Sequence, residues 1–144
     1  FELSIKIYTD GACKGNPGYG GWGALIIYPD HEEEIFGYEE NTTKNRMELL
    51  AAIKALEAIR EKKEVTIYTD SMYLQQGITS WINNWKLNNW RTASKKEVKN
   101  SDLWKRLDDL SNTLNVSWNW VKAHSGHPEN ERADFLANKG ILLK

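Results

Sequence analysis

The sequence predicts a mixed α/β domain in which helices flank a five-stranded mixed sheet, with three antiparallel strands and two parallel ones. Two observations lead to this prediction. Five short, β-prone apolar segments recur along the chain; short turns join the first three, and helical spacing of apolar residues separates the later ones. With 144 residues, 40% of them hydrophobic and 27% charged, the chain suits one domain over residues 1–144 and has no apolar run long enough to cross a bilayer.

The first half of the predicted sheet is an antiparallel meander. Apolar residues alternate over residues 3–9 and predict a strand, whereas the glycine-rich residues 11–21 predict a loop. Residues 22–28 are apolar and predict a buried strand that ends at the turn Pro29-Asp30. Residues 34–40 follow as the third strand, and the short connections favour antiparallel pairing.

Helices and strands alternate through the rest of the chain. The expected elements are a helix capped by Thr42 or Thr43 and ending near Lys62, a strand over 65–69, short helices over 71–88 and 100–113, a strand over 116–121, and a helix from Pro128 toward Lys139 that stops at Gly140. Because the fourth strand is reached through a helix, it is expected to run parallel to the first.

A short repeat marks the ends of two predicted strands. Ile7-Tyr8-Thr9-Asp10 recurs as Ile67-Tyr68-Thr69-Asp70. If the two strands are parallel neighbours, both carboxylates lie on one face at one edge of the sheet, where open α/β sheets bind ligands. Each aspartate could instead cap a turn or the following helix, and this alternative stays open.

Two further carboxylates lie on predicted helices. Glu48 shares its helical stripe with apolar residues and therefore points toward the sheet, where a buried carboxylate needs a partner. A cation shared with the two aspartates would satisfy Glu48; Arg46 or Lys44 is the alternative partner. Asp134 lies beside apolar residues of the last helix, but taken alone it could be an ordinary surface residue.

Carboxylate oxygens suit Mg²⁺ or Mn²⁺, and no cysteine–histidine spacing predicts zinc. Two such ions about 3.5–4 Å apart can activate a water and stabilise the leaving oxygen of a phosphoryl displacement. The sequence therefore predicts a divalent-metal-dependent phosphodiesterase with the ligands Asp10, Glu48, Asp70 and Asp134. His124, in the loop before the last helix, could transfer protons near neutral pH, although a lone loop histidine is often incidental.

Residues 86–106 hold seven basic side chains against two acidic ones, in a chain whose net charge is −1. Two tryptophans, at positions 81 and 85, lie just before this stretch, and two more, at positions 90 and 104, lie within it. Trp81 and Trp85 could stack on nucleic acid while the cations meet phosphates. The alternatives are a small helical subcore, which we expect for Trp90 and Trp104, and a solvated helix surface.

Together these motifs resemble one family, ribonuclease H of type 1 in its bacterial form. The segments that carry the resemblance are Tyr8-Thr9-Asp10-Gly11-Ala12-Cys13, Gly15-Asn16-Pro17-Gly18, Thr42-Thr43-Lys44-Asn45-Arg46-Met47-Glu48-Leu49, Thr69-Asp70-Ser71, the stretch from Trp81 to Trp104, Val121-Lys122-Ala123-His124-Ser125-Gly126-His127 and Glu129-Asn130-Glu131-Arg132-Ala133-Asp134. The resemblance implies a ribonuclease H-like fold. It also implies an endonuclease that hydrolyses the RNA strand of RNA–DNA hybrids and leaves 3′-hydroxyl and 5′-phosphate ends.

The same resemblance implies roles for individual residues. Asp10, Glu48, Asp70 and Asp134 would hold two Mg²⁺ ions with substrate, Mn²⁺ being a possible substitute, and His124 would act in proton transfer or product release. The other implied contacts are Gly11, Cys13, Asn16 and Met72 in the minor groove of the hybrid, Thr43 and Asn100 at a phosphate of the DNA strand, Lys44 and Asn45 beside that strand, and Trp81 and Trp85 in a basic handle over residues 81–100.

Several positions depart from the family pattern. Lys44 stands where asparagine is common, Met72 where glutamine is common and Asn41 where some members have arginine, and Leu87-Asn88-Asn89 makes the handle less basic. None of these changes touches the four carboxylates. We therefore expect ordinary chemistry with weaker and more salt-sensitive hybrid binding.

Other interpretations stay open. Transposases, integrases and junction nucleases resemble this carboxylate arrangement, a hybrid-binding module would lack catalysis, and a structural RNA-binding protein would use only the basic stripe. A cytoplasmic monomer with no membrane segment and no obligate protein partner is expected. Cys13, the only cysteine, favours a reducing compartment, and no signal-peptide pattern opens the chain.

Overall fold

A five-stranded mixed sheet forms the centre of the computed structural model, which describes residues 4–15, 17–59, 64–122 and 127–143. The strands are β1 (Ile5–Gly15), β2 (Gly18–Ile27), β3 (Glu32–Thr42), β4 (Glu64–Thr69) and β5 (Asn115–Trp120), in the spatial order β3-β2-β1-β4-β5. β1, β2 and β3 pair antiparallel, whereas β4 pairs parallel with both β1 and β5. The predicted mixed sheet and the parallel pairing of the first and fourth strands are confirmed.

The glycine-rich segment 11–21 is not the loop that the sequence predicts. β1 continues to Gly15 and β2 begins at Gly18, so most of this segment is a β-hairpin. Gly11 of this segment and Gly23, just beyond it, lie very close to helices. A Cβ on Gly11 would lie 2.5 Å from the Glu48 nitrogen, and one on Gly23 would lie 2.5 Å from the Ala137 nitrogen. These glycines are therefore explained by close packing of helices on strands, not by a flexible loop.

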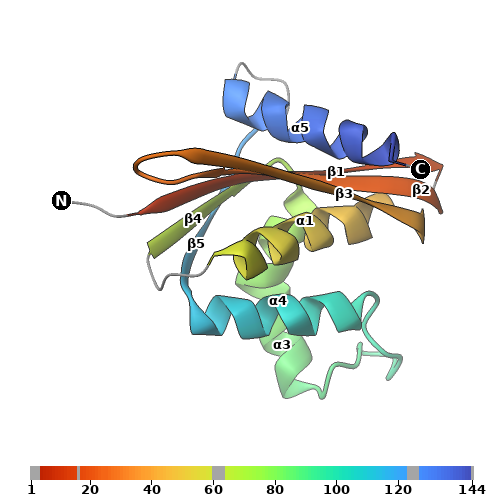
Figure 1. Cartoon of the computed structure of the whole chain (residues 1–144). Helices are drawn as coiled ribbons and strands as arrows, with labels where there is room; N and C mark the ends of the chain where they lie inside the picture. Colours follow the sequence, from red (N-terminus) through yellow and green to blue (C-terminus); the bar gives the residue numbers. More distant parts are fainter. Residues whose placement is uncertain (1–3, 16, 60–63, 123–126, 144) are drawn as a thin grey trace.

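Helices cover both faces of the sheet (Figure 1). α5 (Pro128–Ile141) packs on one face, and α1 (Lys44–Ala58) packs on the other with α4 (Ser101–Thr113) outside it. α1 begins after the cap Thr43, whose side chain accepts a hydrogen bond from the Arg46 nitrogen. It is buried on most of its circumference because it lies between the sheet and α4, and the core fills the space around it.

Two predicted helix ends differ from the structure. α1 ends at Ala58 rather than near Lys62, since Ile59 already has an extended backbone (ψ 121°), and Lys62 itself lies outside the described residues. α5 runs through Gly140 to Ile141. Gly140 lies inside the helix at a point that touches the sheet, since a Cβ there would lie 2.2 Å from the Gly37 carbonyl oxygen of β3. This glycine allows close packing on the sheet instead of stopping the helix.

The segment between β4 and α4 is a run of short helices that leads into an irregular loop. α2 (Met72–Gln76), the π-helical turn η1 (Gly77–Trp81) and α3 (Ile82–Leu87) follow one another without a break. The loop then reaches α4 through an isolated bridge between Arg91 and Glu97. Among the described residues, no helix has the length and apolar character needed to span a membrane.

Candidate metal centre and nucleic-acid interface

Three carboxylates meet where β1 and β4 separate. The parallel register pairs Thr9 with Thr69, so Asp10 and Asp70 follow at neighbouring positions on the two strands. Oxygens of Asp10, Glu48 and Asp70 all lie within 4.8 Å of one another. The structure thus brings together the repeated aspartates and the helical glutamate that the sequence singled out.

Glu48 reaches this point because α1 lies directly against the strand. Gly11 has no side chain to hold the helix backbone away, and β4 has already ended at Thr69, so the edge of β1 beside Asp10 is open on that side. The Glu48 side chain is 2% exposed, and its Oε1 has no hydrogen-bond partner. Its Oε2 lies 4.0 Å from the Lys44 ammonium. A buried carboxylate oxygen without a partner is costly, and a bound cation would satisfy it.

Arg46 does not neutralise Glu48. Its guanidinium makes an ion pair with Asp102 of α4, with 2.8 Å between Nη2 and Oδ2. A second guanidinium nitrogen donates to Asn100 Oδ1 at 3.0 Å. Of the two cations considered from the sequence, only Lys44 lies near the glutamate.

Asp134 approaches the cluster from the opposite face of the sheet. It lies on α5, which comes close to β2 at Gly23, the antiparallel partner of Asp10. All four carboxylates line one cleft of about 320 Å³. The other residues that line it are Lys44, Asn45, Ser71, Met72 and Tyr73.

The concentration of negative charge changes the acidity of the two buried carboxyls. Burial, followed by the charge of Asp70 and a hydrogen bond shared with Asp134, raises the pKa of Asp10 to about 8. Burial and the charges of Asp10 and Asp70 raise the pKa of Glu48 well above its ordinary value, against a smaller lowering by Lys44. Both shifts mean that gathering negative charge in a buried place is unfavourable for these carboxylates.

The donor set fits a hard divalent cation. The converging ligands are all carboxylate oxygens, which Mg²⁺ and Mn²⁺ prefer, and no thiol or imidazole of the described residues joins them. The partnerless Oε1 of Glu48 and the raised pKa of Asp10 are two separate signs that the cluster lacks positive charge. A cation bound by these oxygens would supply that charge.

Two neighbours of the cluster escaped the sequence-based prediction. Asn130 is buried on α5, and its amide lies within 3.5 Å of Asp70 Oδ2, at the limit of a hydrogen bond. It shares a helical stripe with Asp134 and apolar residues, which is the same signal that pointed to Glu48. Tyr73 lines the cleft, and its hydroxyl accepts hydrogen bonds from Asn100 and Trp104; no sequence pattern distinguishes it.

The residues expected at a DNA phosphate lie together around Arg46. Thr43 caps α1 through the Arg46 nitrogen, and Asn100 accepts from the Arg46 guanidinium while its amide donates to Tyr73. Asn100 has a left-handed backbone (φ 63°) and precedes α4. The sequence pattern did not place Arg46 with these residues, because it gives no indication that α1 and α4 meet here.

The expected minor-groove residues follow the hairpin and the cleft. Gly11 is buried under α1, and Cys13 lies farther along β1 with its thiol 3.5 Å from the Thr42 carbonyl oxygen. Lys44, Asn45 and Met72 line the carboxylate cleft itself. Asn16 and His124 lie outside the described residues, so their predicted roles stay predictions.

The tryptophans divide into an exposed and a packed group. Trp104 is fully buried, and Trp85 packs against it and Trp90 with centroid distances of 5.3 and 6.4 Å. Trp81 is 37% exposed and lies at the outer end of this stack. Trp81 therefore offers the more accessible ring surface, whereas Trp85 mainly holds the handle together.

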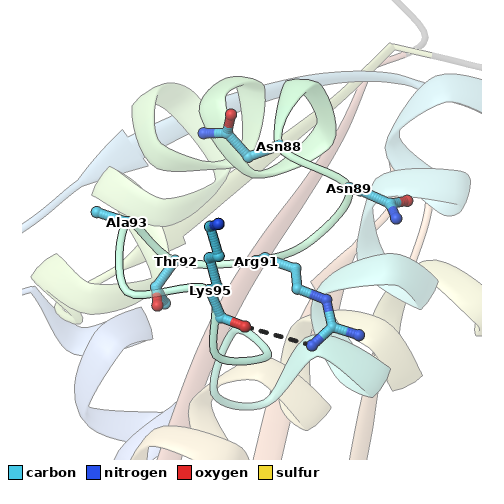
Figure 2. A pocket seen from close by; sticks show the side chains of 6 residues that line it. All are labelled: Asn88, Asn89, Arg91, Thr92, Ala93 and Lys95. Carbon is cyan, nitrogen blue, oxygen red and sulfur yellow. Dashed lines mark hydrogen bonds between the residues drawn. The ribbon is translucent and has the colours of Figure 1, made fainter.

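The handle loop contains a separate hollow of about 550 Å³. Figure 2 shows its lining, which comprises Asn88, Asn89, Arg91, Thr92, Ala93 and Lys95. The Arg91 guanidinium turns back onto the Lys95 carbonyl oxygen at 3.4 Å (Figure 2). No carboxylate lines this hollow, whereas the cations Arg91 and Lys95 do. It is therefore suited to an anion and not to a metal ion.

Comparisons with known proteins agree with this geometry. The family model described as RNase H matches residues 2–142. A ribonuclease H of Francisella tularensis subsp. novicida (strain U112) is 63% identical over 137 residues, which cover 95% of this chain and 90% of that protein. A ribonuclease H of Francisella philomiragia is likewise 63% identical, over 138 residues that cover 96% of this chain and 91% of that protein.

Solved structures share the architecture. LC9-RNase H1, a type 1 RNase H with the type 2 active-site motif, superposes with a TM-score of 0.87 at 32% identity, covering 97% of this chain and 72% of the other. LC11-RNase H1, whose crystal structure is in complex with an RNA/DNA hybrid, gives a TM-score of 0.71 at 25% identity, covering 96% and 97% of the two chains.

Proposed function

Because this chain belongs to the RNase H family, we propose that it is an endonuclease that hydrolyses the RNA strand of RNA–DNA hybrids and leaves 5′-phosphate and 3′-hydroxyl ends. One observation in this chain's own structure supports the proposal. The buried Glu48 carboxylate, whose Oε1 has no hydrogen-bond partner, lies near Asp10 and Asp70, and one oxygen from each of the three lies within 4.8 Å of the other two. That arrangement is what a metal-dependent phosphodiesterase requires.

We assign the metal ligands as Asp10, Glu48, Asp70 and Asp134. Two Mg²⁺ ions bound with substrate, or Mn²⁺ in their place, would polarise the scissile phosphate and lower the pKa of an attacking water. The chain's own part is to hold four carboxylates in one cleft, one from β1, one directly after β4 and two from helices. His124 is proposed to move a proton during the reaction or to aid product release.

Hybrid recognition is proposed to use surfaces on both sides of the cleft. Lys44, Asn45 and Met72 line the cleft and would meet the substrate beside the metal ligands. Gly11 and Cys13 of β1 would meet it too, and the same role is proposed for Asn16, which lies outside the described residues. Thr43 and Asn100, joined through Arg46, would hold a phosphate of the DNA strand. Trp81 and Trp85 would lie along that strand in the handle, with Trp81 as the exposed ring.

This assignment is supported by a relative that binds the proposed substrate, since LC11-RNase H1 was solved with an RNA/DNA hybrid. We further propose that residues 1–144 act as one domain and as a monomer without an obligate partner. The cytoplasm is the proposed location.

A cleavage assay tests the proposal directly. End-labelled RNA–DNA hybrid, duplex DNA and duplex RNA are incubated with the protein in Mg²⁺ or in EDTA. We expect cleavage of the RNA strand of the hybrid alone, and only with metal. Cleavage of duplex DNA would favour a relative of transposases or junction nucleases, and binding without cleavage would favour a recognition module.

Asp10→Asn provides the matched site variant. It is expected to abolish turnover while hybrid binding stays within about threefold of wild type, because the surfaces that bind nucleic acid are unchanged. Asp109→Asn removes the same charge from the exposed face of α4 and serves as the control with wild-type turnover. Full activity of the Asp10 variant would refute the assignment of the site.

A further inference from the structure

Lys44 is a cation inside the carboxylate cleft. It is the first residue of α1, directly after the cap Thr43, and it lines the same cleft as Asp10, Glu48, Asp70 and Asp134. Its ammonium lies 4.0 Å from Glu48 Oε2, one helical turn along the chain. The Lys44 side chain is 63% exposed, so it reaches the buried glutamate from the solvent side.

The requirements of the helix do not explain a lysine at this position. The first turn of a helix carries a partial positive charge from its free N–H groups, so cations there are unfavourable and acidic residues are preferred. In α1 no acidic residue occupies the first turn and a lysine opens it. The carboxylate cluster supplies negative charge beside this lysine, because the ammonium lies 4.0 Å from Glu48 Oε2 and lines the same cleft.

A metal ion and the ammonium would draw on the same negative charge. Glu48 lies within ion-pair distance of Lys44 and is also a proposed metal ligand. A divalent ion held by Glu48 would therefore bind close to a fixed positive charge, and the two cations repel each other through partly exposed solvent.

We propose that Lys44 pairs with Glu48 before metal binds and thereby lowers the affinity of the site for divalent cations. This inference rests on the proposed function, because it presupposes that the four carboxylates bind metal. The ammonium offsets part of the cluster's charge in the metal-free protein, and its exposed stem lets it move toward solvent when the ion arrives. The site consequently responds to higher metal concentrations than a neutral residue at position 44 would require.

Isothermal titration calorimetry of the free protein with Mg²⁺, and in parallel with Mn²⁺, tests this inference without using activity. Lys44→Asn is expected to bind the ion roughly three- to tenfold more tightly than wild type, as screened Coulomb repulsion over several ångströms predicts. Lys44→Arg keeps the charge and is expected to stay within about twofold of wild type. The gain in Lys44→Asn should shrink as NaCl is raised.

Lys54→Asn is the matched control. It removes the same charge from the same helix, but Lys54 lines a different hollow, together with Asp102 and Arg106. Its metal affinity is expected to equal that of wild type. The metal-induced rise in melting temperature should be larger for Lys44→Asn than for the other three proteins, since tighter binding to the folded state stabilises it more.

The outcomes separate the two levels of the proposal. Unchanged or weaker metal binding in Lys44→Asn, or an equal gain in Lys54→Asn, would overturn the role of Lys44 and leave the metal site standing. A wild-type protein that binds neither Mg²⁺ nor Mn²⁺ would overturn the site and the inference together.

Discussion

Replacing Asp10 by asparagine is expected to stabilise the metal-free protein at alkaline pH while removing a proposed metal ligand. Asp10 is 4% exposed, and burial, followed by the charge of Asp70, raises the pKa of its carboxyl from 3.8 to about 8. Asparagine has nearly the same shape and no charge. The substitution therefore relieves repulsion without opening a cavity.

The sign and size of the effect follow from this pKa. Since the folded-state pKa lies above that of the unfolded chain, the protonated carboxyl is the form that favours folding. Its contribution is fully present below about pH 4 and is lost as the pH rises to about 8. Each pH unit in this window lowers the free energy of unfolding by about 1.4 kcal/mol, which gives a ceiling of about 6 kcal/mol for the whole window.

Urea unfolding in EDTA measures this difference. Between pH 5 and pH 9, the free energy of unfolding of Asp10→Asn should rise relative to that of wild type by at least about 2 kcal/mol. Comparing the two proteins at each pH cancels the other titrating groups, and Asp109→Asn controls for loss of an exposed carboxylate. The same pH dependence in Asp10→Asn and wild type would refute the reasoning.

Three further predictions concern packing, metal support and substrate binding. Gly23→Ala places a methyl group 2.5 Å from the Ala137 nitrogen and 2.7 Å from the Leu136 carbonyl carbon, so urea unfolding should show a loss of about 1–3 kcal/mol; wild-type stability would contradict this close packing. Asn130→Ala removes the amide beside Asp70 and should weaken Mn²⁺ binding about tenfold by calorimetry, whereas unchanged affinity would reduce Asn130 to a packing role. Asn41→Arg adds a cation to the hollow that contains Arg46 and should tighten hybrid binding roughly threefold or more at 150 mM NaCl; anisotropy in an Asp10→Asn background measures it, and equal affinities would count against a phosphate there.

The convergence of Asp10 and Asp70 could be predicted because it depends only on local pattern. The repeat Ile-Tyr-Thr-Asp was expected to end both strands; the second copy does end β4, whereas β1 continues past Asp10 to Gly15. A helical connection makes parallel pairing the expected arrangement, and the observed register aligns Ile7, Tyr8 and Thr9 with Ile67, Tyr68 and Thr69. Glu48 was predictable for a similar reason, since a carboxylate on an apolar helical stripe must face the core and find a partner there.

The partner of Arg46 could not be predicted in this way. Asp102 lies 56 residues farther along the chain, and nothing in either segment indicates that α1 and α4 pack with these two side chains in contact. The same holds for Tyr73 of α2, whose hydroxyl accepts hydrogen bonds from Asn100 and Trp104 at the start of α4. Such contacts depend on how helices pack together, which the periodicity of a single helix does not determine.

The glycine-rich hairpin, which the sequence predicted as a loop, positions the helices that carry two of the carboxylates. Gly11 follows Asp10 and lets α1 lie against β1 on one face, while Gly23, the strand partner of Asp10, lets α5 lie against β2 on the other. Glu48 and Asp134 thus reach the same aspartate from opposite faces because two side chains are missing beside it. The packing brings these carboxylates together, and the raised pKa of Asp10 reflects the electrostatic cost of doing so. A divalent cation would offset that cost, so the same packing that stores instability in the metal-free protein should make metal binding favourable.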